Sequence, residues 1–252
     1  MKIVVTVKQV PDPSSTFSLE ADNSLSREKE VVLDPGDECG VEEALQLKES
    51  HGGEVVLVSM GPERAKEAVR KGLSMGADRG ILITDAGLAG ADALLTARVL
   101  AAAIKAESPD IVICGTESYD GSTGMVPPML AELLGMPQLT FAKKVEVTDS
   151  MLKIHRQTAD GYQVVEAPRP ALITVTAAIA EPRYASLKGI MAARSKEIKQ
   201  LSLSDLGVEK SEPAETIQGV VEAETRKAGQ VVEDDGSAVD KIVAVLAEAK
   251  VL

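Results

Sequence analysis

The chain has 252 residues, of which 44% are hydrophobic and 26% charged, which allows a packed core and argues against wholesale disorder. Its 27 Lys and Arg residues face 39 Asp and Glu residues, and this net charge of −12 argues against a nucleic-acid binder with a basic face. No apolar run reaches the roughly 18 residues of a membrane span. The first 13 residues read as a strand and not as a secretory leader, so we expect a cytoplasmic protein without a membrane span.

Cysteine, histidine and aromatic residues, which often form metal sites, catalytic centres and stacking surfaces, are scarce in this chain. Cys39 and Cys114 cannot form a Cys-x-x-Cys pair, and we expect two buried thiols in a reducing cytosol. His51 follows a helical run and His155 lies in an alternating stretch, so neither predicts a metal site or a catalytic centre. With five aromatic residues and no Trp, the composition predicts no stacking platform for bases.

In the first half of the chain, buried strands alternate with helices. Such an alternation predicts parallel strands with crossover helices, a doubly wound, Rossmann-like α/β domain. Residues 11–33 read as a loop or hairpin, and Asp37 is placed to cap the first helix. The expected elements are strands at Ile3–Val7, Glu54–Ser59, Gly80–Thr84 and Asp110–Cys114, with helices from Asp37 to His51, from Pro62 to Gly76, at Ala91–Ala106 and at Met129–Leu134.

After Gly135 the period of the apolar residues changes. Strands are expected at Phe141–Val147, Leu152–Thr158, Tyr162–Glu166 and Leu172–Thr176, with a hairpin turn at Asp160-Gly161, as an antiparallel extension of the same sheet. A basic, partly helical segment follows at Ala185–Lys199. Residues 207–236 read as a polar linker or extended arm before an amphipathic helix at Ala238–Leu252. We therefore expect a domain at 1–206 and an arm with a helix at 207–252.

The loop from Tyr119 to Pro128 is the most informative candidate for a ligand site. Ligands of open α/β sheets bind at the carboxyl ends of strands, where the segments 6–10, 34–37, 59–62 and 115–128 would converge. The loop offers two glycines and the hydroxyls of Ser122 and Thr123 before a helix, which suits a phosphate. The alternative is an ordinary strand-to-helix turn. No dinucleotide fingerprint, P-loop, nucleophile elbow or convincing carboxylate pair is present, which favours nucleotide binding without side-chain catalysis.

A second unusual stretch runs from Ala180 to Glu197. It combines apolar side chains with arginines and lysines on an otherwise acidic protein. One interpretation is a segment that caps its own sheet. The other is a docking surface for a second protein, because interfaces place apolar anchors inside a charged rim.

Seven segments spread along the chain form a specific set. They are Val5-Thr-Val-Lys-Gln-Val10, Val41-Glu-Glu-Ala-Leu-Gln-Leu-Lys48, Val58-Ser-Met-Gly-Pro62, Gly72-Leu-Ser-Met-Gly-Ala-Asp-Arg79, Pro170-Ala-Leu-Ile-Thr174, Glu181-Pro-Arg-Tyr-Ala-Ser-Leu187 and Gly189-Ile-Met-Ala-Ala193. Together they resemble the beta (small) subunit of electron transfer flavoproteins, over nearly the whole chain.

The resemblance implies an electron carrier and not an enzyme. It implies a heterodimer whose alpha subunit holds most of the contacts to FAD, with a structural AMP in this subunit and an arm after Gly207 that wraps the alpha subunit. Electrons would pass from acyl-CoA or related dehydrogenases through FAD to a membrane quinone oxidoreductase or another acceptor. The implied nucleotide-binding residues are Thr6, Asp34, Pro35, Gly36, Asp37, Met60, Asp120, Gly121, Ser122, Thr123, Gly124, Met125 and Val126, within a mapped loop that runs on to Leu130. The resemblance also implies a recognition loop on which the dehydrogenases dock, with Leu187 as its anchor. Its partner-binding residues are Glu181, Arg183, Tyr184, Leu187, Lys188, Ile190 and Met191.

The phosphate loop departs from both patterns of the family. AMP-type members read Asp-Asp-Asp-x-Asn-Gln-Thr-Gly, whereas this chain has Val126 and Pro127 in place of Thr-Gly. Electron-bifurcating members, which hold a second FAD in place of AMP, read Asp-Gly-Asp-Thr-Ala-Gln-Val-Gly-Pro, and the chain shares five of those positions. Pro13 and Gly36 replace aromatic residues that lie near the flavin in some members. A bifurcating subunit and a stand-alone adenine-nucleotide-binding enzyme remain the alternatives.

Overall fold

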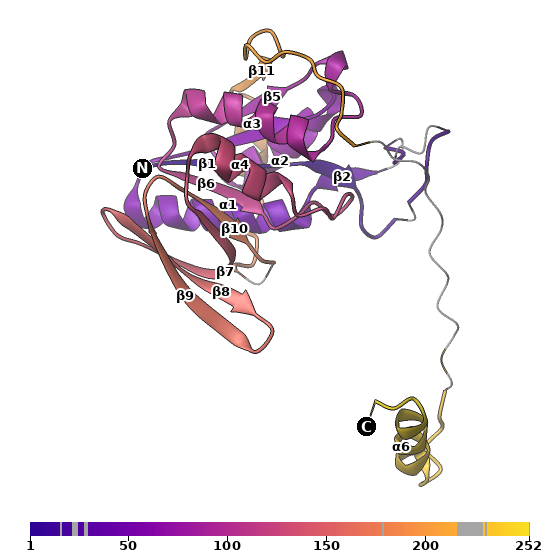
Figure 1. The fold of residues 1–252 in the computed structure, drawn as a ribbon. Coiled ribbons are helices and arrows are strands. Elements are labelled where there is room, and N and C mark those ends of the chain that lie inside the picture. Colours follow the sequence, from indigo (N-terminus) through magenta and orange to yellow (C-terminus); the bar gives the residue numbers. More distant parts are fainter. Residues whose placement is uncertain are drawn as a thin grey trace. The chain divides into compact units, whose positions relative to one another are not determined.

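The computed structural model describes residues 1–15, 17–21, 25–27, 30–177, 179–215, 229 and 231–251. The chain divides into two compact units, Met1–Ile217 and Gln218–Leu252. The first unit contains the sheet and the helices that cover it, and the second contains one described helix (Figure 1).

The first unit is built on a nine-stranded, mostly parallel sheet in the order β11-β5-β4-β1-β6-β10-β7-β8-β9. Its centre consists of short apolar runs, whose residues are buried because helices cover both faces. Val4 of β1, for example, pairs with Val56 of β4 on one side and Val112 of β6 on the other. The parallel strands are β1 (Lys2–Thr6), β4 (Glu54–Met60), β5 (Arg79–Ile83), β6 (Ile111–Gly115), β10 (Ala171–Val175) and β11 (Ile198–Leu201).

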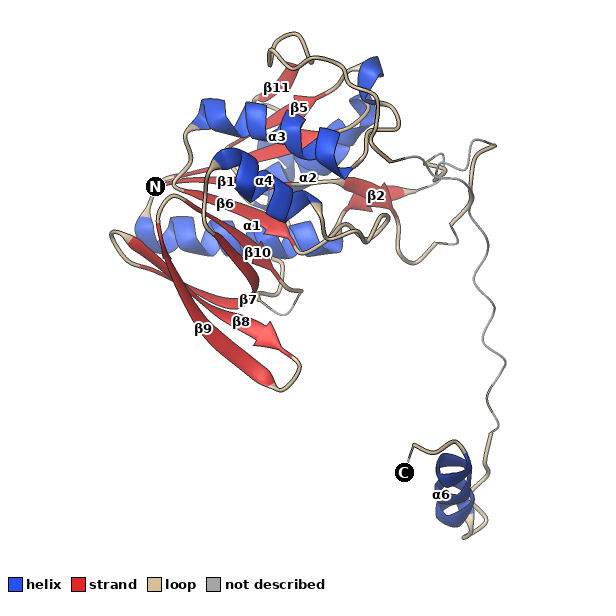
Figure 2. Cartoon of the chain, in the orientation of Figure 1, coloured by secondary structure: helices blue, strands red, loops and turns tan. Residues whose placement is uncertain are grey.

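Two pairs of helices cover the two faces of this sheet (Figures 1 and 2). Helices α1 (Pro35–His51) and α2 (Lys66–Met75) pack on the face that carries Ile3 and Val5. Helices α3 (Ala93–Glu107) and α4 (Val126–Leu134) pack on the opposite face. Short 3-10 turns precede α2 and α3, at Glu63–Ala65 and Ala86–Leu88. This arrangement confirms the doubly wound fold predicted from the alternating pattern.

The antiparallel part of the sheet differs in one respect from the prediction. Strands β7 (Gln138–Val147), β8 (Met151–Thr158) and β9 (Gly161–Pro168) form the expected antiparallel extension. Strand β10, expected to belong to it, instead lies between β6 and β7 and is parallel to both. In the sheet, β10 and β8 lie on opposite edges of β7: the residues up to Ala142 pair with β10, and those from Ala142 onward pair with β8.

The start of α1 also differs from the expectation. Asp34, and not Asp37, is the N-cap: its Oδ1 accepts a hydrogen bond from the Gly36 N–H at 2.8 Å, and Pro35 occupies the first helical position. Asp37 lies inside the first turn and is buried. The preceding segment forms a hairpin of β2 (Gln9–Pro11) and β3 (Val31–Leu33), in agreement with the loop-or-hairpin interpretation.

Residues 185–201 contain a strand that the sequence pattern did not indicate. The short helix α5 (Leu187–Ala193) falls in the expected helical segment, and β11 then pairs in parallel with β5 at the edge of the sheet. Cys39 and Cys114 are buried free thiols, as predicted.

The second unit contains α6 (Ala238–Glu248), which confirms the predicted amphipathic helix; its apolar side chains are exposed within this unit. Residues 216–228 and 230 of the expected arm lie outside the described residues. Among the described residues, no helix combines the length and apolar character that crossing a bilayer requires.

Candidate functional site

The loops at the carboxyl edge of the sheet meet where the strand order reverses, between β1 and β6. The N-cap Asp34 joins two of them: its Oδ2 accepts a hydrogen bond from the Tyr119 N–H at 2.7 Å, so the loop after β6 is fixed against the start of α1. Burial raises the pKa of Asp34 above its ordinary value, and the two N–H donors oppose that shift only in part. The switch point, the place where the strand order reverses, thus contains a carboxyl group that positions the loops.

Asp37 plays a similar positioning role one turn further along α1. Its Oδ2 accepts a hydrogen bond from the Lys8 N–H at 2.7 Å. A Cβ on Gly115 would lie 2.8 Å from Oδ1 of Asp37. The end of β6 can therefore approach this carboxyl group so closely only because Gly115 has no side chain. Burial and the charge of Asp34 raise the pKa of Asp37 well above its ordinary value.

Asp120 fixes the candidate phosphate loop, residues 119–128, to a neighbouring segment. Its side chain is 3% exposed and forms ion pairs with Lys8 at 2.6 Å and with Arg27 at 2.5 Å. Burial opposes the charge, but the two cations outweigh it and hold the pKa of Asp120 below its ordinary value. Because both carboxylate oxygens are occupied, Asp120 fixes the loop to the β2–β3 hairpin segment.

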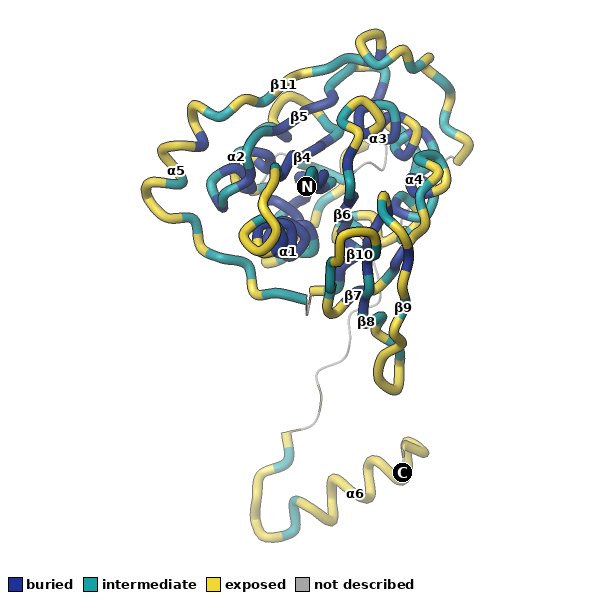
Figure 3. The backbone as a smooth tube through the Cα atoms, turned by 90° about the vertical axis from the view of Figure 1, so that its left-hand side faces the viewer, coloured by how far each residue is buried: buried dark blue, intermediate teal, exposed yellow. Residues whose placement is uncertain are grey.

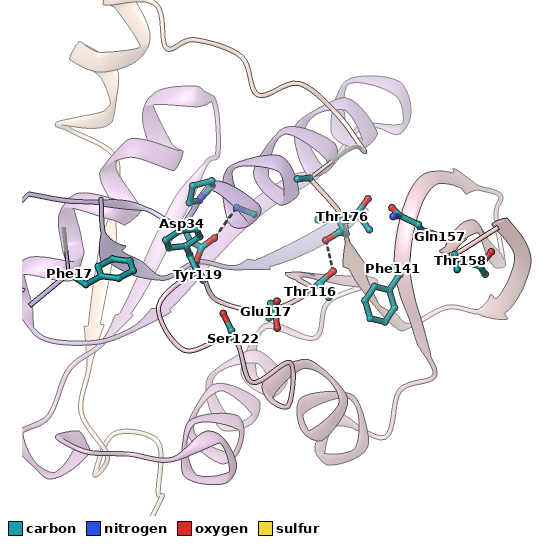
Figure 4. A pocket seen from close by; sticks show the side chains of 15 residues that line it. Phe17, Asp34, Thr116, Glu117, Tyr119, Ser122, Phe141, Gln157, Thr158 and Thr176 are labelled. Atoms are coloured by element: carbon teal, nitrogen blue, oxygen red, sulfur yellow. Dashed lines mark hydrogen bonds between the residues drawn. The ribbon is translucent and has the colours of Figure 1, made fainter. Parts of the chain in front are cut away.

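A cleft of about 1100 Å³ opens beside this network (Figure 4). Its walls come from the start of α1, the loop after β6, the corner of β7, the β8–β9 turn and the end of β10. The lining residues are Phe17, Asp34, Pro35, Gly36, Thr116, Glu117, Tyr119, Ser122, Phe141, Gln157, Thr158, Ala159, Val175, Thr176 and Ala177.

The nucleotide-binding residues predicted from the sequence divide into three groups. Asp34, Pro35, Gly36 and Ser122 line the cleft, and Gly124 lines a smaller neighbouring cavity of about 210 Å³. Asp37 and Asp120 are the buried positioning carboxyl groups described above. The other residues line neither cavity: Thr6, Met60, Gly121, Thr123, Met125 and Val126, of which Met60 and Val126 pack against the core of the α3–α4 face.

Sequence reasoning missed most of the far wall of the cleft. Phe141, Gln157 and Thr158 come from the antiparallel extension, which was not expected to contact a ligand. Thr116 and Glu117 directly follow β6 and lie in the segment 115–128 that was expected at this edge of the sheet, although neither was among the predicted site residues. Phe17 lies within residues 11–33, which the sequence pattern described only as a loop or hairpin.

The N-terminus of α4 contributes fewer backbone donors than a typical helix. Val126 is its first residue, and Pro127 and Pro128 have no N–H to offer an anion. The donors available to a phosphate are therefore in the loop: among the described residues, the N–H groups of Gly121, Thr123 and Gly124 reach no acceptor. A φ of +61° at Gly124 gives the loop a turn that favours glycine.

The candidate partner-binding residues lie on the crossing segment (residues 180–197), outside α1 and α2 (Figure 3). Tyr184 is 95% exposed and Leu187 76% exposed, and Glu181, Lys188, Ile190 and Met191 are also exposed. Arg183 instead points to α1, where it pairs with Glu42 at 2.7 Å and with Glu49 at 2.6 Å. The segment thus combines a patch of exposed apolar side chains with a tether to α1, the ion pairs of Arg183.

Comparison with known sequences identifies the family of the chain. The model of the electron transfer flavoprotein domain matches residues 23–206. The chain belongs to the electron transfer flavoprotein subunit beta family. The family beta subunit from Mycobacterium tuberculosis is 41% identical, with 99% of each chain covered.

Other beta subunits of the family support the same conclusion. The protein from Clostridium acetobutylicum is 39% identical over 96% of this chain and 93% of its own length. The protein from Megasphaera elsdenii is 34% identical over the full length of both chains. Membership of the electron transfer flavoprotein family implies a role in electron transport, association with a flavin and an alpha-subunit partner.

Proposed function

We propose that this chain is the beta subunit of a cytoplasmic, heterodimeric electron transfer flavoprotein. The observation that carries the proposal is the similarity to beta subunits of this family over 99% of the chain. In the proposal the alpha subunit holds most of the FAD, dehydrogenases dock on the crossing segment, and a membrane quinone oxidoreductase or another acceptor takes the electrons. The flavin, when bound, supplies the electron-transfer chemistry.

The switch-point loops suit an adenine nucleotide in two respects. The N–H groups of Gly121, Thr123 and Gly124, which reach no acceptor within the described part of the chain, are donors suited to phosphate oxygens. The cleft next to them, walled partly by aromatic and hydroxyl side chains, has room for a ring and a ribose. The carboxylates of Asp34 and Glu117 disfavour a phosphate inside the cleft itself. We therefore place the phosphate on the loop and leave the cleft to uncharged parts of the ligand.

We propose AMP as the occupant, with a second FAD as the alternative. The occupant decides between a one-flavin carrier and a bifurcating subunit.

The test is the nucleotide content of the complex coexpressed with a candidate alpha subunit. The complex is denatured and the released nucleotides are quantified by chromatography. One FAD and one AMP per heterodimer support the proposal, whereas two FAD and no AMP make the bifurcating subunit the better assignment. A chain that stays monomeric and colourless on coexpression contradicts both.

The Gly121→Val variant tests the loop within the same complex. A Cβ at Gly121 would lie 3.2 Å from the Ser118 Oγ, which would have to move by a few tenths of an ångström to admit a side chain. We expect Gly121→Val to lose the nucleotide by blocking the approach of the phosphate, with Gly121→Ala intermediate. Full stoichiometry in Gly121→Val, with an unchanged circular dichroism spectrum, contradicts the placement of the phosphate.

A further inference from the structure

Helix α5 packs through its small residues and presents its large apolar residues to solvent. Gly189 and Ala193 face α2: Ala193 is 4% exposed, and a Cβ on Gly189 would clash with the Ser74 carbonyl oxygen. Leu187 and Met191 are 76% and 64% exposed. The members of each pair are four positions apart and therefore share one face of the helix. The exposed face of α5 lies on the outside of the molecule (Figure 3).

Met191 is the most exposed of the eight methionines of the chain, all of which the structure describes. Met125 is 47% exposed, Met75 is 5% exposed, and the rest are partly buried. A small oxidant in solution can therefore reach the thioether sulfur of Met191 more easily than that of any other methionine here. Exposure of this kind makes a methionine susceptible to conversion into its sulfoxide.

A sulfoxide at this position would change the surface of the protein and leave the fold intact. Met191 lies one helical turn after Leu187, in the patch of exposed apolar side chains that includes Tyr184 and Ile190. Oxidation replaces a soft, apolar thioether with a polar S=O group. The contacts that hold α5 on α2 are made by the opposite face of the helix. The new oxygen would thus lie beside the side chain proposed as the docking anchor.

We propose that Met191 is an oxidation site that controls docking, because its sulfoxide form weakens the binding of a dehydrogenase to the crossing segment. The oxidant is hydrogen peroxide. The sulfur attacks one peroxide oxygen, an S–O bond forms as the O–O bond breaks, and water leaves. The sulfur gives up two electrons and the peroxide accepts them. Methionine sulfoxide reductases, one for each sulfoxide epimer, return the thioether.

The inference rests on the proposed docking of dehydrogenases, and its test uses the complex coexpressed with the alpha subunit. The complex is treated with hydrogen peroxide, which catalase then removes, and peptide mass spectrometry locates the oxidised methionines. The electron donor is an acyl-CoA dehydrogenase of the source organism, chosen as the one that reduces the complex fastest. Its steady-state kinetics give kcat and the KM for the complex.

We expect Met191 to be oxidised before Met125, in the order of their exposure. The KM should then rise by about fivefold or more, the effect of one lost interface contact, and kcat should stay within about twofold. Such a split assigns the loss to binding and not to the electron-transfer step. Treatment with both sulfoxide reductases should restore the KM, and the circular dichroism spectrum should stay unchanged throughout.

Two variants, each compared with itself before and after peroxide, identify the sulfur responsible. Met191→Leu should show no rise in KM after treatment, because leucine is apolar and has no sulfur to oxidise. Met125→Leu, at the other exposed methionine, should show the same rise as the wild type. Both complexes contain the methionines of the alpha subunit, so an effect of those residues would also appear in treated Met191→Leu.

Three results overturn the oxidation site. They are oxidation of Met125 without oxidation of Met191, complete oxidation of Met191 with an unchanged KM, and an equal loss in treated Met191→Leu and treated wild type. Leu187→Ala separates this failure from that of the proposed docking. Slower transfer in Leu187→Ala combined with any of the three results overturns the oxidation site alone. Unchanged transfer in Leu187→Ala overturns the docking surface, and the oxidation site with it.

Discussion

Glu43 is a buried glutamate on α1, and replacing it with glutamine should stabilise the protein at neutral pH. The residue is 7% exposed. Its neighbour Glu42 is ion-paired with Arg183, but the influences on the pKa of Glu43 include no cation. Burial and the charge of Glu42 raise the pKa of Glu43 from 4.5 to about 7.

The sign and the size of the effect follow from this shift. A carboxyl group whose pKa is raised in the folded state costs nothing below its unfolded pKa, and the cost grows as the pH rises to the folded pKa. A shift from 4.5 to about 7 corresponds to about 3 kcal/mol at 1.36 kcal/mol for each pH unit. Between pH 5 and pH 8, Glu43→Gln should gain about 2.5 kcal/mol relative to the wild type, because glutamine does not titrate.

The assay is urea unfolding of wild type and variant at several pH values between 5 and 8. The difference between their free energies of unfolding isolates Glu43 from the other titrating groups. Glu132→Gln, at an exposed glutamate of α4, is the matched control and should give a flat difference. A flat difference for Glu43→Gln as well would refute the reasoning, since it would mean that the carboxyl group stays ionised at no cost.

Three further predictions concern the loop, the tether and the exposed patch. Asp120→Asn should destabilise the chain by about 2 kcal/mol at pH 7, because Lys8 and Arg27 lose a buried counter-charge. This loss of stability should shrink as the pH falls toward the lowered pKa of Asp120. Urea unfolding of wild type and variant at pH 3–7 measures it. Arg183→Ala should cost about 2 kcal/mol in the same assay, since it leaves a buried glutamate of α1 unpaired; a change below about 0.5 kcal/mol would contradict this. Leu187→Ala should leave stability and nucleotide content unchanged, because the side chain is 76% exposed, but slow electron transfer from a partner dehydrogenase by about fivefold or more; unchanged transfer kinetics would contradict its role as an anchor.

Local sequence patterns predicted most of the first unit. Continuous apolar runs such as Ile3–Val5 identified the parallel strands, because helices bury both faces of the sheet. Gly52, Gly76 and Gly135 mark the ends of helices, and each has the positive φ that glycine accepts without strain. These signals act within a few residues of the chain, and a sequence displays them directly.

What the sequence could not predict depends on contacts between distant segments. The insertion of β10 between β6 and β7 is accompanied by a register shift in the pairing of β10 with β7 next to Phe141, whose φ is +57°, and no local pattern indicates either feature. The choice of Asp34 over Asp37 as the N-cap depends on distant partners of the two carboxyl groups. The Lys8 N–H donates to Asp37, whereas the Tyr119 N–H of the loop after β6 donates to Asp34. Composition counted the aromatic residues but could not place them at one cleft.

The crossing segment is held to the body at several points along its length. Arg183 ties its beginning to Glu42, and a Cβ on Gly189 would lie 2.4 Å from the Ser74 carbonyl oxygen, so α5 sits directly on α2. Near its end, the Lys196 ammonium donates to two carbonyl oxygens of the α2 region. A protein that binds the exposed side chains between these points meets a backbone already fixed in place. Little conformational entropy is then lost on association, so that even a small contact area can support a rapid and reversible encounter.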